Sequence, residues 1–303
     1  KKWNKEYIFA RNQGTGYSDN IHQEKCMAAN GMGGWSGLCP TQELVDAYEM
    51  ANGSTPIIGY NADGTPIING ASGYSETGFA ATAGKHYPAG VYNMYVGREP
   101  RFYASINFNG QQWRGRQLEF WQGGKDGINV SKVDYCCTGY LLRKTADEGV
   151  DVINGKGGMK EASILFRVGS LYLDYAEALN EAEGPVDDVY KYVDAIRKRA
   201  GLPGLAKGLD KDKMRERIQH ERQIELAFEA GHRYFDCHRW KIAEKTDNGY
   251  MHGMNITATN KVDYSKRSTV GDSRVFEKKH YLFPIPQSEM DKRIGLVQSP
   301  YWE

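Results

Sequence analysis

Carboxylates recur every four residues in one charged stretch of the sequence, at Glu221, Glu225 and Glu229. On a helix these side chains share one face, with neighbours about 6 Å apart. That separation overlaps the distance between the two carboxyl groups of glycoside hydrolases. A hydrolase also needs one raised and one lowered pKa in an open cleft, so the residues around the row must decide its role.

The surroundings of this row favour a structural role over a catalytic one. Like charges at this spacing repel each other unless cations neutralise them. Several arginines lie near the row in the sequence: Arg217, Arg222, Arg233 and Arg239. We therefore predict a buried ion-pair network, and we keep a glycoside hydrolase that uses Glu221 and Glu225 as the less favoured alternative.

Flat aromatic side chains among polar neighbours are the better candidates for ligand contact. A sugar has flat C–H faces and a rim of hydroxyl groups, which aromatic rings, planar amides and guanidinium groups can contact. The alternative is that such large rings belong to the hydrophobic core. The candidate ligand-binding residues of the first half of the chain are Trp35, Tyr60, Tyr74, Tyr87, Trp113, Arg114 and Trp121.

The histidines and cysteines do not form a recognisable metal or cofactor site. No HExxH motif and no CxxC pair occurs, and the spacing of His232, Asp236 and His238 suits no common metal site. Nucleophile and phosphate-binding motifs are also missing. We expect no cofactor and no metal. Cys26 and Cys39 could form a disulfide across the glycine-rich loop in an oxidising compartment.

Composition narrows the class of protein. The chain has 303 residues, 40% of them hydrophobic and 25% charged, with a net charge of +1. A nucleic-acid partner is therefore not expected, because such binding needs clustered cations. No apolar run reaches the roughly 18 residues that span a bilayer, and no signal peptide is recognisable. Because residue 1 is Lys, we expect a fragment or a processed product.

The first half of the chain is predicted to consist mainly of loops. A helix is expected over residues 41–50, where Leu44, Val45 and Tyr48 form an apolar stripe. A hairpin is expected from the repeats Thr55–Ile58 and Thr65–Ile68, with a turn around Asp63-Gly64. Strands are predicted at 102–108 and 140–144.

The second half is predicted to be helical. Apolar residues recur at helical spacing from Ser163 to Glu183, and a partner helix runs from Asp187 or Asp188 towards Gly201. These two helices form an αα-hairpin that resembles a tetratricopeptide unit. Further helices are expected over 211–230 and 232–243, and residues after 243 are expected to be mostly irregular.

Five blocks of the sequence resemble the SusD/RagB family of surface glycan-binding lipoproteins. They occur in the family's order and are Pro40–Glu49, Glu99–Phe102, Gly139–Lys144, Ile164–Glu181 and Tyr281–Glu289. The resemblance spans nearly the whole chain but only the later part of a family member.

The resemblance implies a mainly α fold, a SusD-like α-α superhelix with a TPR-like helical pair and long irregular, partly β loops. Within one structural domain we expect three parts. Residues 1–160 form the loop-rich, aromatic, ligand-facing part, 161–245 the helical TPR-like scaffold, and 246–303 an irregular tail packed on that scaffold.

The resemblance also implies a function. Such a protein binds an oligosaccharide on the extracellular face of the outer membrane, without cleaving it, and delivers it to a SusC-like TonB-dependent transporter. The membrane is contacted only through a lipid anchor that lies outside this chain. A peptide ligand is the close alternative. Loops after the helix at 41–50 contribute to the family's ligand platform, so Tyr60 and Tyr74 carry the strongest positional expectation.

Overall fold

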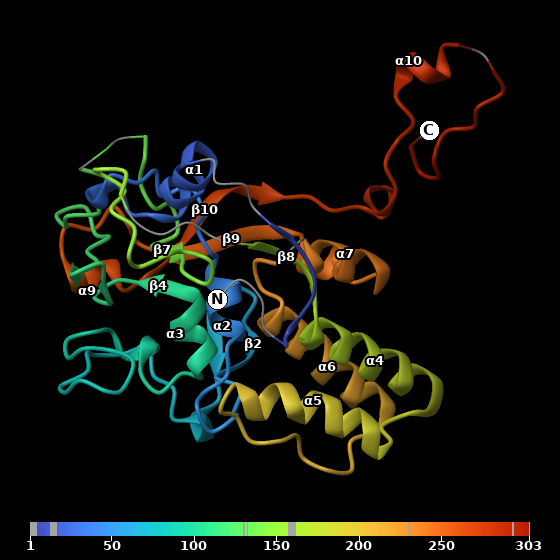
Figure 1. Cartoon of the computed structure of the whole chain (residues 1–303), viewed down its shortest axis with the longest axis horizontal. Coiled ribbons are helices and arrows are strands. Elements are labelled where there is room, and N and C mark those ends of the chain that lie inside the picture. The colour runs from blue at the N-terminus through green and yellow to red at the C-terminus, as the bar shows by residue number, and fades with distance from the viewer. Residues whose placement is uncertain are drawn as a thin grey trace.

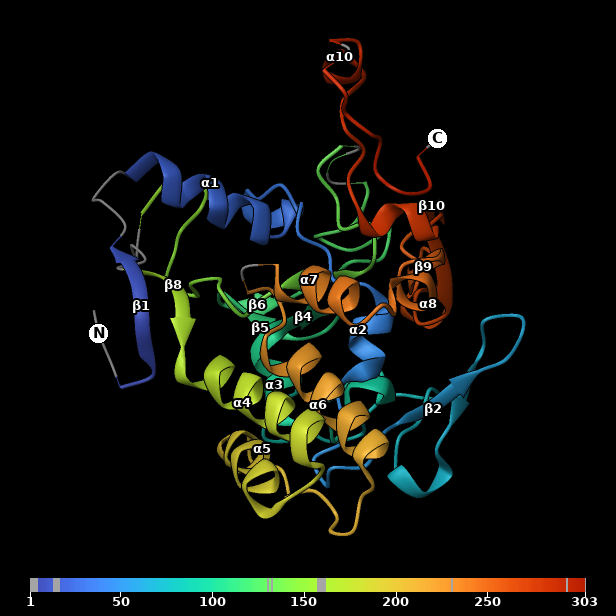
Figure 2. The same ribbon diagram turned by 90° about the vertical axis from the view of Figure 1, so that its right-hand side faces the viewer.

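Three helices form the scaffold of the second half of the chain. The computed structural model describes residues 5–12, 17–129, 131, 133–156, 162–229, 231–292 and 294–302. Helices α4 (Val168–Glu183), α5 (Asp187–Arg199) and α6 (Lys211–Glu225) lie side by side, as Figures 1 and 2 show. The predicted αα-hairpin is therefore α4 and α5, and its likeness to a tetratricopeptide unit stays a prediction.

The apolar spacing of these helices explains their packing. Val189 and Val193 of α5 are fully buried against Ala176 of α4 and against Met214 and Ile218 of α6. Burial of such side chains contributes about 1.5–3 kcal/mol each. Asp210 caps α6, since its Oδ1 accepts a hydrogen bond from the backbone N–H of Lys213 at 2.8 Å.

Several boundaries of the predicted helices are wrong, including the ends of the helices expected over 41–50 and 232–243, which are Ala47 and Arg239. The segment before Val168 is strand β8 (Ala162–Arg167), which pairs antiparallel with β1 (Tyr7–Asn12). The run from Ile164 to Phe166 is apolar and contains a β-branched and an aromatic residue, so it suits a strand as well as a helix. Helix α6 ends at Glu225 rather than Ala230, which lies outside the described residues, and Phe228 has a left-handed φ of 63°.

The loop-rich part contains more regular structure than predicted. The predicted hairpin is confirmed as β2 (Ile57–Tyr60) and β3 (Pro66–Ile68). The predicted strand at 102–108 is wrong in its first half, because Pro100 starts a helix. The remaining elements are α1 (Tyr17–Met27), η1 (Asn30–Met32), α2 (Gln42–Ala47), η2 (Gly70–Ser72), η3 (Asn93–Tyr95), α3 (Pro100–Ser105), β4 (Ile106–Phe108), β5 (Gln112–Trp113), β6 (Arg116–Gln117) and β7 (Tyr140–Leu142).

The largest hydrophobic core lies in this loop-rich part. Strands β4 and β7 pair antiparallel, and their side chains are all buried. The rings of Tyr95 and Phe108 have centroids 4.4 Å apart, and Tyr95 meets Tyr140 edge to face at 6.1 Å. Large aromatic side chains therefore provide much of the core in a region where helices are short.

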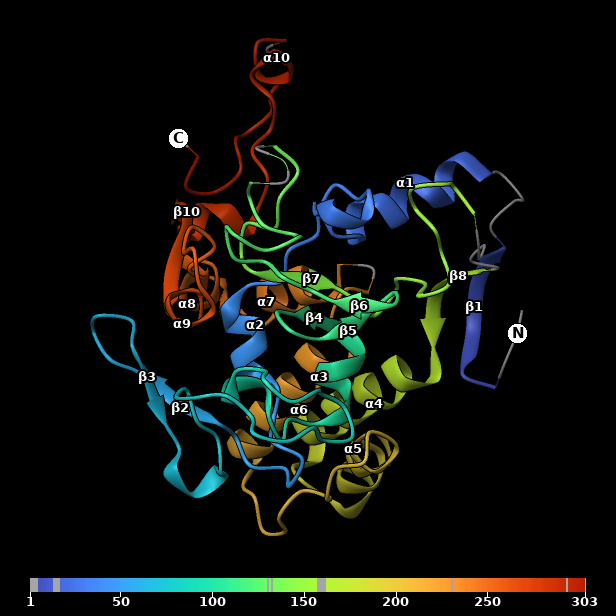
Figure 3. The ribbon, with the colours of Figure 1, turned by 90° about the vertical axis from the view of Figure 1, so that its left-hand side faces the viewer.

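Residues after 243 contain more regular structure than predicted. Strands β9 (Gly249–Met254) and β10 (Arg267–Arg274) form an antiparallel hairpin, and Met254 and Tyr264 are buried in the aromatic core. Figures 1 and 3 show the last segment, with α10, extending away from the helical scaffold. The other elements are α7 (His232–Arg239), α8 (Ala243–Thr246), α9 (Lys261–Tyr264), η4 (Lys278–Tyr281) and α10 (Gln287–Met290).

The prediction of a mainly α fold overstates the helix content. Within the described residues the strands form five separate two-stranded sheets, and the helices other than α1 and α4–α6 are short. The fold is a mixed one with modest helix content. No helix in the described part of the chain is long and apolar enough to cross a membrane.

Candidate functional site

The carboxylate row of α6 lies inside a network of cations. The carboxylate of Glu221 contacts Arg101 at 2.6 Å and Arg197 at 3.0 Å. Glu225 contacts Arg101 at 3.1 Å, and its other oxygen contacts two further arginines, Arg167 at 2.8 Å and Arg199 at 2.5 Å. Both carboxylates are almost completely buried. The predicted ion-pair network is therefore confirmed.

The cations come from segments far away in the sequence, not from the neighbouring arginines. Arg101 lies on α3, Arg167 ends β8, and Lys144 follows β7 and contacts Glu229 at 2.5 Å. Of the expected partners, Arg217 pairs with Glu49, and Arg222 pairs with Asp236 at 2.9 Å. Arg222 directly follows Glu221 on the helix and therefore faces a different direction, whereas Arg217 has the helical spacing to reach Glu221 but pairs with Glu49 instead.

This network does not have the properties of a catalytic pair. Burial alone would raise the pKa of Glu225, but Arg199, Arg167 and Arg101 outweigh burial and lower that pKa to about 2. A glycoside hydrolase needs a protonated carboxylic acid at working pH. We therefore do not carry the hydrolase alternative with Glu221 and Glu225 forward.

The predicted ligand-binding residues lie in very different surroundings. Trp35 and Tyr60 are 38% and 48% exposed, whereas Tyr74 and Trp113 are only 6% and 3% exposed. The Trp35 ring stacks on His22 with centroids 5.5 Å apart. The Tyr60 hydroxyl donates to Asp46 at 2.7 Å. Exposed rings can contact a ligand with one face, so Trp35 and Tyr60 remain candidate ligand-binding residues.

Several candidates are covered by protein atoms. Trp113 is buried, and the guanidinium groups of Arg114 and Arg143 lie 5.5 and 4.8 Å from its ring centroid. Arg114 itself pairs with Glu24 at 2.7 Å.

Of the other two candidate rings, Tyr74 is buried and Trp121 is half-buried. Arg98 lies 5.3 Å from the Tyr74 ring centroid. Trp121 packs on the aromatic core, with Lys261 5.1 Å from its ring centroid. Trp121 does not line the pocket described next, and we carry neither ring into the proposed site.

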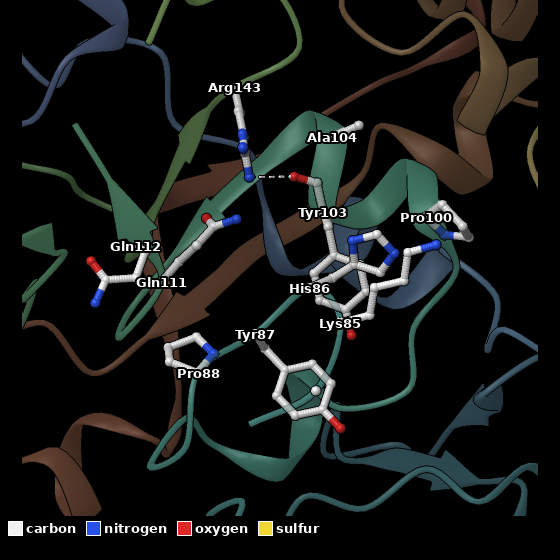
Figure 4. A pocket seen from close by; sticks show the side chains of 11 residues that line it. Lys85, His86, Tyr87, Pro88, Pro100, Tyr103, Ala104, Gln111, Gln112 and Arg143 are labelled. Atoms are coloured by element: carbon white, nitrogen blue, oxygen red, sulfur yellow. Dashed lines mark hydrogen bonds between the residues drawn. The ribbon is translucent and has the colours of Figure 1, made fainter. Parts of the chain in front are cut away.

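Tyr87 lines a cavity of about 680 Å³, here called the Tyr87 pocket (Figure 4). This volume is within the roughly 300–1,000 Å³ typical of small-molecule pockets. Its aromatic wall consists of Tyr87 and His86, which both stack on Tyr103 with centroids 6.2 and 5.0 Å away. The full lining is Gly84, Lys85, His86, Tyr87, Pro88, Pro100, Tyr103, Ala104, Gln111, Gln112 and Arg143.

A tight turn sets the position of the Tyr87 ring. The N–H of Gly84 donates to the carbonyl oxygen of Tyr87 at 2.9 Å. A Cβ atom on Gly84 would lie 2.4 Å from Cζ of Tyr87, so only glycine allows the ring to lie against the backbone. The sequence therefore fixes the ring through the residue three positions before it.

Amide and guanidinium groups form the polar wall of the Tyr87 pocket. Nη1 of Arg143 donates to the carbonyl oxygen of Tyr103 at 2.8 Å, and Gln112 is exposed beside it. The Gln111 amide nitrogen is buried and has no hydrogen-bond acceptor in the described part of the chain. Two glutamines near Trp113 were thus recognisable from the sequence, whereas Tyr103 and Arg143 were not recognised. The blocks Glu99–Phe102 and Gly139–Lys144 lie beside them and were the available signal.

The Tyr87 pocket is built beside the ion-pair network. Tyr103 lies on α3 two residues after Arg101, and Arg143 directly precedes Lys144. Arg101 and Lys144 both hold carboxylates of the α6 row. Two walls of the pocket are therefore fixed by the same residues that attach α3 and β7 to α6.

Tyr60 lines a second cavity of about 670 Å³, here called the Tyr60 cleft. Exposed rings of Phe228 and Tyr250 line it together with charged groups of both signs, among them Glu43 and Arg233. Trp35 and the half-buried Trp121 line neither cavity, so the structure does not bring the less buried candidate rings into one site.

The five cysteines are all free thiols. The suggested bridge between Cys26 and Cys39 is therefore absent, and the Cys39 sulfur instead lies 3.8 Å from that of Cys136. The described residues contain no group of His, Cys, Asp and Glu side chains suited to holding a metal ion.

A sequence model of the SusD family matches residues 3–302. The chain belongs to the SusD family. The resemblance carried by the five sequence blocks is thus confirmed. Among family members, SusD-like protein P25 of Formosa agariphila is 42% identical over 82 residues, which are 26% of this chain and 15% of that protein.

Solved structures of SusD-like proteins have the same fold. A SusD-like protein from Bacteroides fragilis has 30% identity and a TM-score of 0.71, with 99% of this chain and 55% of that chain covered. A SusD-like carbohydrate binding protein from the same species has 23% identity and a TM-score of 0.71, with 95% and 53% covered. The chain thus spans about half the length of these SusD-like structures, and a smaller share of the curated relative.

Proposed function

We propose that this SusD-family chain binds an oligosaccharide at the cell surface and delivers it, uncleaved, to a SusC-like TonB-dependent transporter. Family membership supports surface glycan binding and a lipid anchor outside this chain. The observation that carries the proposal is the Tyr87 pocket, in which stacked rings lie beside amide and guanidinium donors. These are the groups that a sugar's flat face and hydroxyl rim require.

In this proposal the ring of Tyr87 contacts a sugar face, and Gln112 and Arg143 contact its hydroxyl groups. No Asp or Glu lines the Tyr87 pocket, so its lining residues provide no carboxylate pair for hydrolysis. Delivery to a transporter requires release of the sugar. We therefore expect a dissociation constant between micromolar and millimolar, which corresponds to about −8 to −4 kcal/mol.

Calorimetric titration with a panel of oligosaccharides tests the proposal. The Tyr87→Ala variant should weaken binding of whichever oligosaccharide binds by about two- to tenfold, because stacking of one ring contributes about 0.5–1.5 kcal/mol. The matched control is Tyr250→Ala, which removes an exposed ring of the Tyr60 cleft. This variant should bind the oligosaccharide as the unmodified chain does. Absence of any oligosaccharide binding would refute the proposal. Loss of binding in Tyr250→Ala alone would move the site to the Tyr60 cleft.

A peptide ligand is the second candidate, and the Tyr60 cleft favours it. The cleft combines the apolar ring of Phe228 with Glu43, Arg233 and Arg274. Groups of both charge signs beside an apolar surface suit a peptide better than an uncharged sugar. A panel of short peptides titrated under the same conditions distinguishes the two, since peptide binding lost in Tyr250→Ala would replace the oligosaccharide proposal.

A further inference from the structure

We propose that the Tyr87 pocket selects carbohydrates that carry an anionic group, a carboxylate or a sulfate ester, over neutral ones. This inference rests on the proposed function and narrows its class of ligand. It starts from the charged residues of the pocket lining, which are the cations Lys85 and Arg143 and no Asp or Glu.

The two cations act on the interior of the pocket. The pKa of His86 is lowered, first by burial and then by the charges of Lys85 and Arg143. The charges of Lys85 and Arg143 therefore act at the part of the pocket wall where His86 lies. A concave surface lined by charges of one sign concentrates ligands of the opposite sign.

Arg143 lacks the close carboxylate that most other half-buried arginines of this chain have. Arg101 has Glu221 at 2.6 Å and Arg116 has Asp126 at 2.6 Å. The carboxylate nearest to Arg143 is Glu148 at 3.9 Å, and that side chain is 59% exposed. Burial accordingly lowers the pKa of Arg143, although its guanidinium stays charged. An anion from a ligand would supply the missing counter-charge.

The Arg143 guanidinium is held in place for such a contact. It stacks on Trp113 at 4.8 Å and donates from Nη1 to the carbonyl oxygen of Tyr103 at 2.8 Å. A guanidinium has five N–H donors, and within the described residues only this one has an acceptor. The remaining donors can bind a carboxylate or sulfate through two parallel hydrogen bonds.

The surroundings of Arg143 fit a sugar that carries the anion. In Figure 4 the Arg143 guanidinium and the amide of Gln111 lie near each other on one side of the pocket, and the Tyr87 ring lies on the other side. The amide nitrogen of Gln111 is a buried donor without an acceptor, which is an unfavourable state that a ligand oxygen at the pocket floor would relieve. A sugar ring on Tyr87 therefore places its anionic substituent towards Arg143, which lacks a close carboxylate, and towards the unpaired Gln111 amide nitrogen.

Three probes with the same backbone test this inference by calorimetry on the 303-residue chain: trigalacturonate, neutral galactotriose and sulfated galactotriose. At least one anionic probe should bind about tenfold more tightly than the neutral one, since one charge-assisted contact accounts for that factor. The comparison of the two anionic probes shows which group fits. The preference should shrink as salt is added, because exposed Lys85 contributes to it.

Variants assign the preference to the pocket. Arg143→Gln should bring the anionic and neutral affinities within about threefold, and Lys85→Gln should lower the anionic affinity by about two- to threefold. Lys198→Gln removes an equal charge from an exposed site on α5, outside both cavities, and should change neither affinity. Circular dichroism confirms that Arg143→Gln is folded, and the exposed Lys85 supplies an independent variant.

The outcomes separate this inference from the function on which it rests. Equal binding of neutral and anionic probes would overturn the charge selection and leave oligosaccharide binding intact. A preference that persists in both Arg143→Gln and Lys85→Gln would also overturn it, because the anion would then lie elsewhere. Binding of none of the three probes would overturn the charge selection, whereas the proposed function is overturned only if no oligosaccharide of the calorimetric panel binds.

Discussion

Glu225 shows how a buried carboxylate stays charged in this protein. Its two oxygens are shared among Arg101, Arg167 and Arg199, so its pKa falls to about 2 in spite of burial. The spacing of the row predicted ion pairing, because repulsion between like charges four residues apart is a local property. The partners were not predictable, since they come from α3, β8 and α5, which only the folded chain brings together.

The Glu225→Gln variant should destabilise the chain strongly. It leaves three cations around a neutral amide in a buried place, and removing one partner of a buried pair costs about 3–5 kcal/mol. The free energy of unfolding in urea measures the loss. Glu216→Gln on the same helix is the matched control, because Glu216 is exposed and should change stability by about 0.5 kcal/mol or less. Similar stabilities of the two variants would contradict the buried network.

The helices of the scaffold were the most predictable elements. Apolar residues at helical spacing located α4, α5 and α6, whereas β8 and the hairpin of β9 and β10 were missed. The apolar residues of strand β8 also fit the helical spacing that continues into α4. Strands β9 and β10 are rich in Gly, Ser and Arg and lack a clear alternation, so their pairing depends on contacts with the core rather than on their own sequence.

Two leucines of α4 should respond very differently to truncation. Leu173 is fully buried against Ile196 and Leu226, whereas Leu171 is 44% exposed. Leu173→Ala leaves a cavity and should cost about 2–5 kcal/mol, and Leu171→Ala should cost much less. Thermal unfolding of both variants measures the difference. Equal shifts of the melting temperature would show that α4 does not pack as described.

Gly253 of β9 is expected to accept no larger residue. A Cβ atom there would lie 2.5 Å from the carbonyl oxygen of Thr138, which is backbone and cannot move aside easily. Gly253→Ala should therefore destabilise the chain by about 1–3 kcal/mol. Gly70→Ala serves as the control, since no atom lies within 4 Å of its added Cβ. Urea unfolding compares them, and a neutral Gly253→Ala would show that β9 lies farther from Thr138.

The free energy of unfolding of the whole chain should depend on pH, because buried ionisable groups have shifted pKa values. The pKa of His220 is lowered from 6.5 to about 4, chiefly by burial and then by Arg217. The unfolded chain therefore binds a proton at a higher pH than the folded chain. The contribution of neutral His220 to the free energy of unfolding is complete above pH 6.5. It decreases by up to about 3 kcal/mol as the pH falls towards 4. Glu225 adds a further loss between about pH 4.5 and 2, which Glu99 opposes because its pKa is raised by burial.

Urea unfolding at a series of pH values checks this dependence. The unmodified chain should lose stability from pH 6.5 downwards, and His220→Gln should lose markedly less between pH 6.5 and 4. At pH 7 the histidine is neutral, so the comparison there gives the effect of the substitution alone. Parallel curves for the two chains over this interval would mean that His220 titrates normally.

The sequence predicted the family and a set of candidate rings, but not which rings are covered. Tyr87 and Trp113 both lie among polar residues, yet Tyr87 lines the pocket described above, whereas Trp113 is buried in the aromatic core. Arg143, which comes from a distant segment, also lies 4.8 Å from the Trp113 ring centroid. Burial of a ring thus depends on contacts with other segments, which composition and spacing do not reveal.

The walls of the Tyr87 pocket are attached to the region of α6 by ion pairs, since Tyr103 and Arg143 lie close in sequence to Arg101 and Lys144. Movement of either wall would have to break ion pairs that α6 also uses. We therefore expect the cavity to keep its shape when empty. A sugar would then enter without waiting for any closure step, and little conformational entropy would be lost on binding.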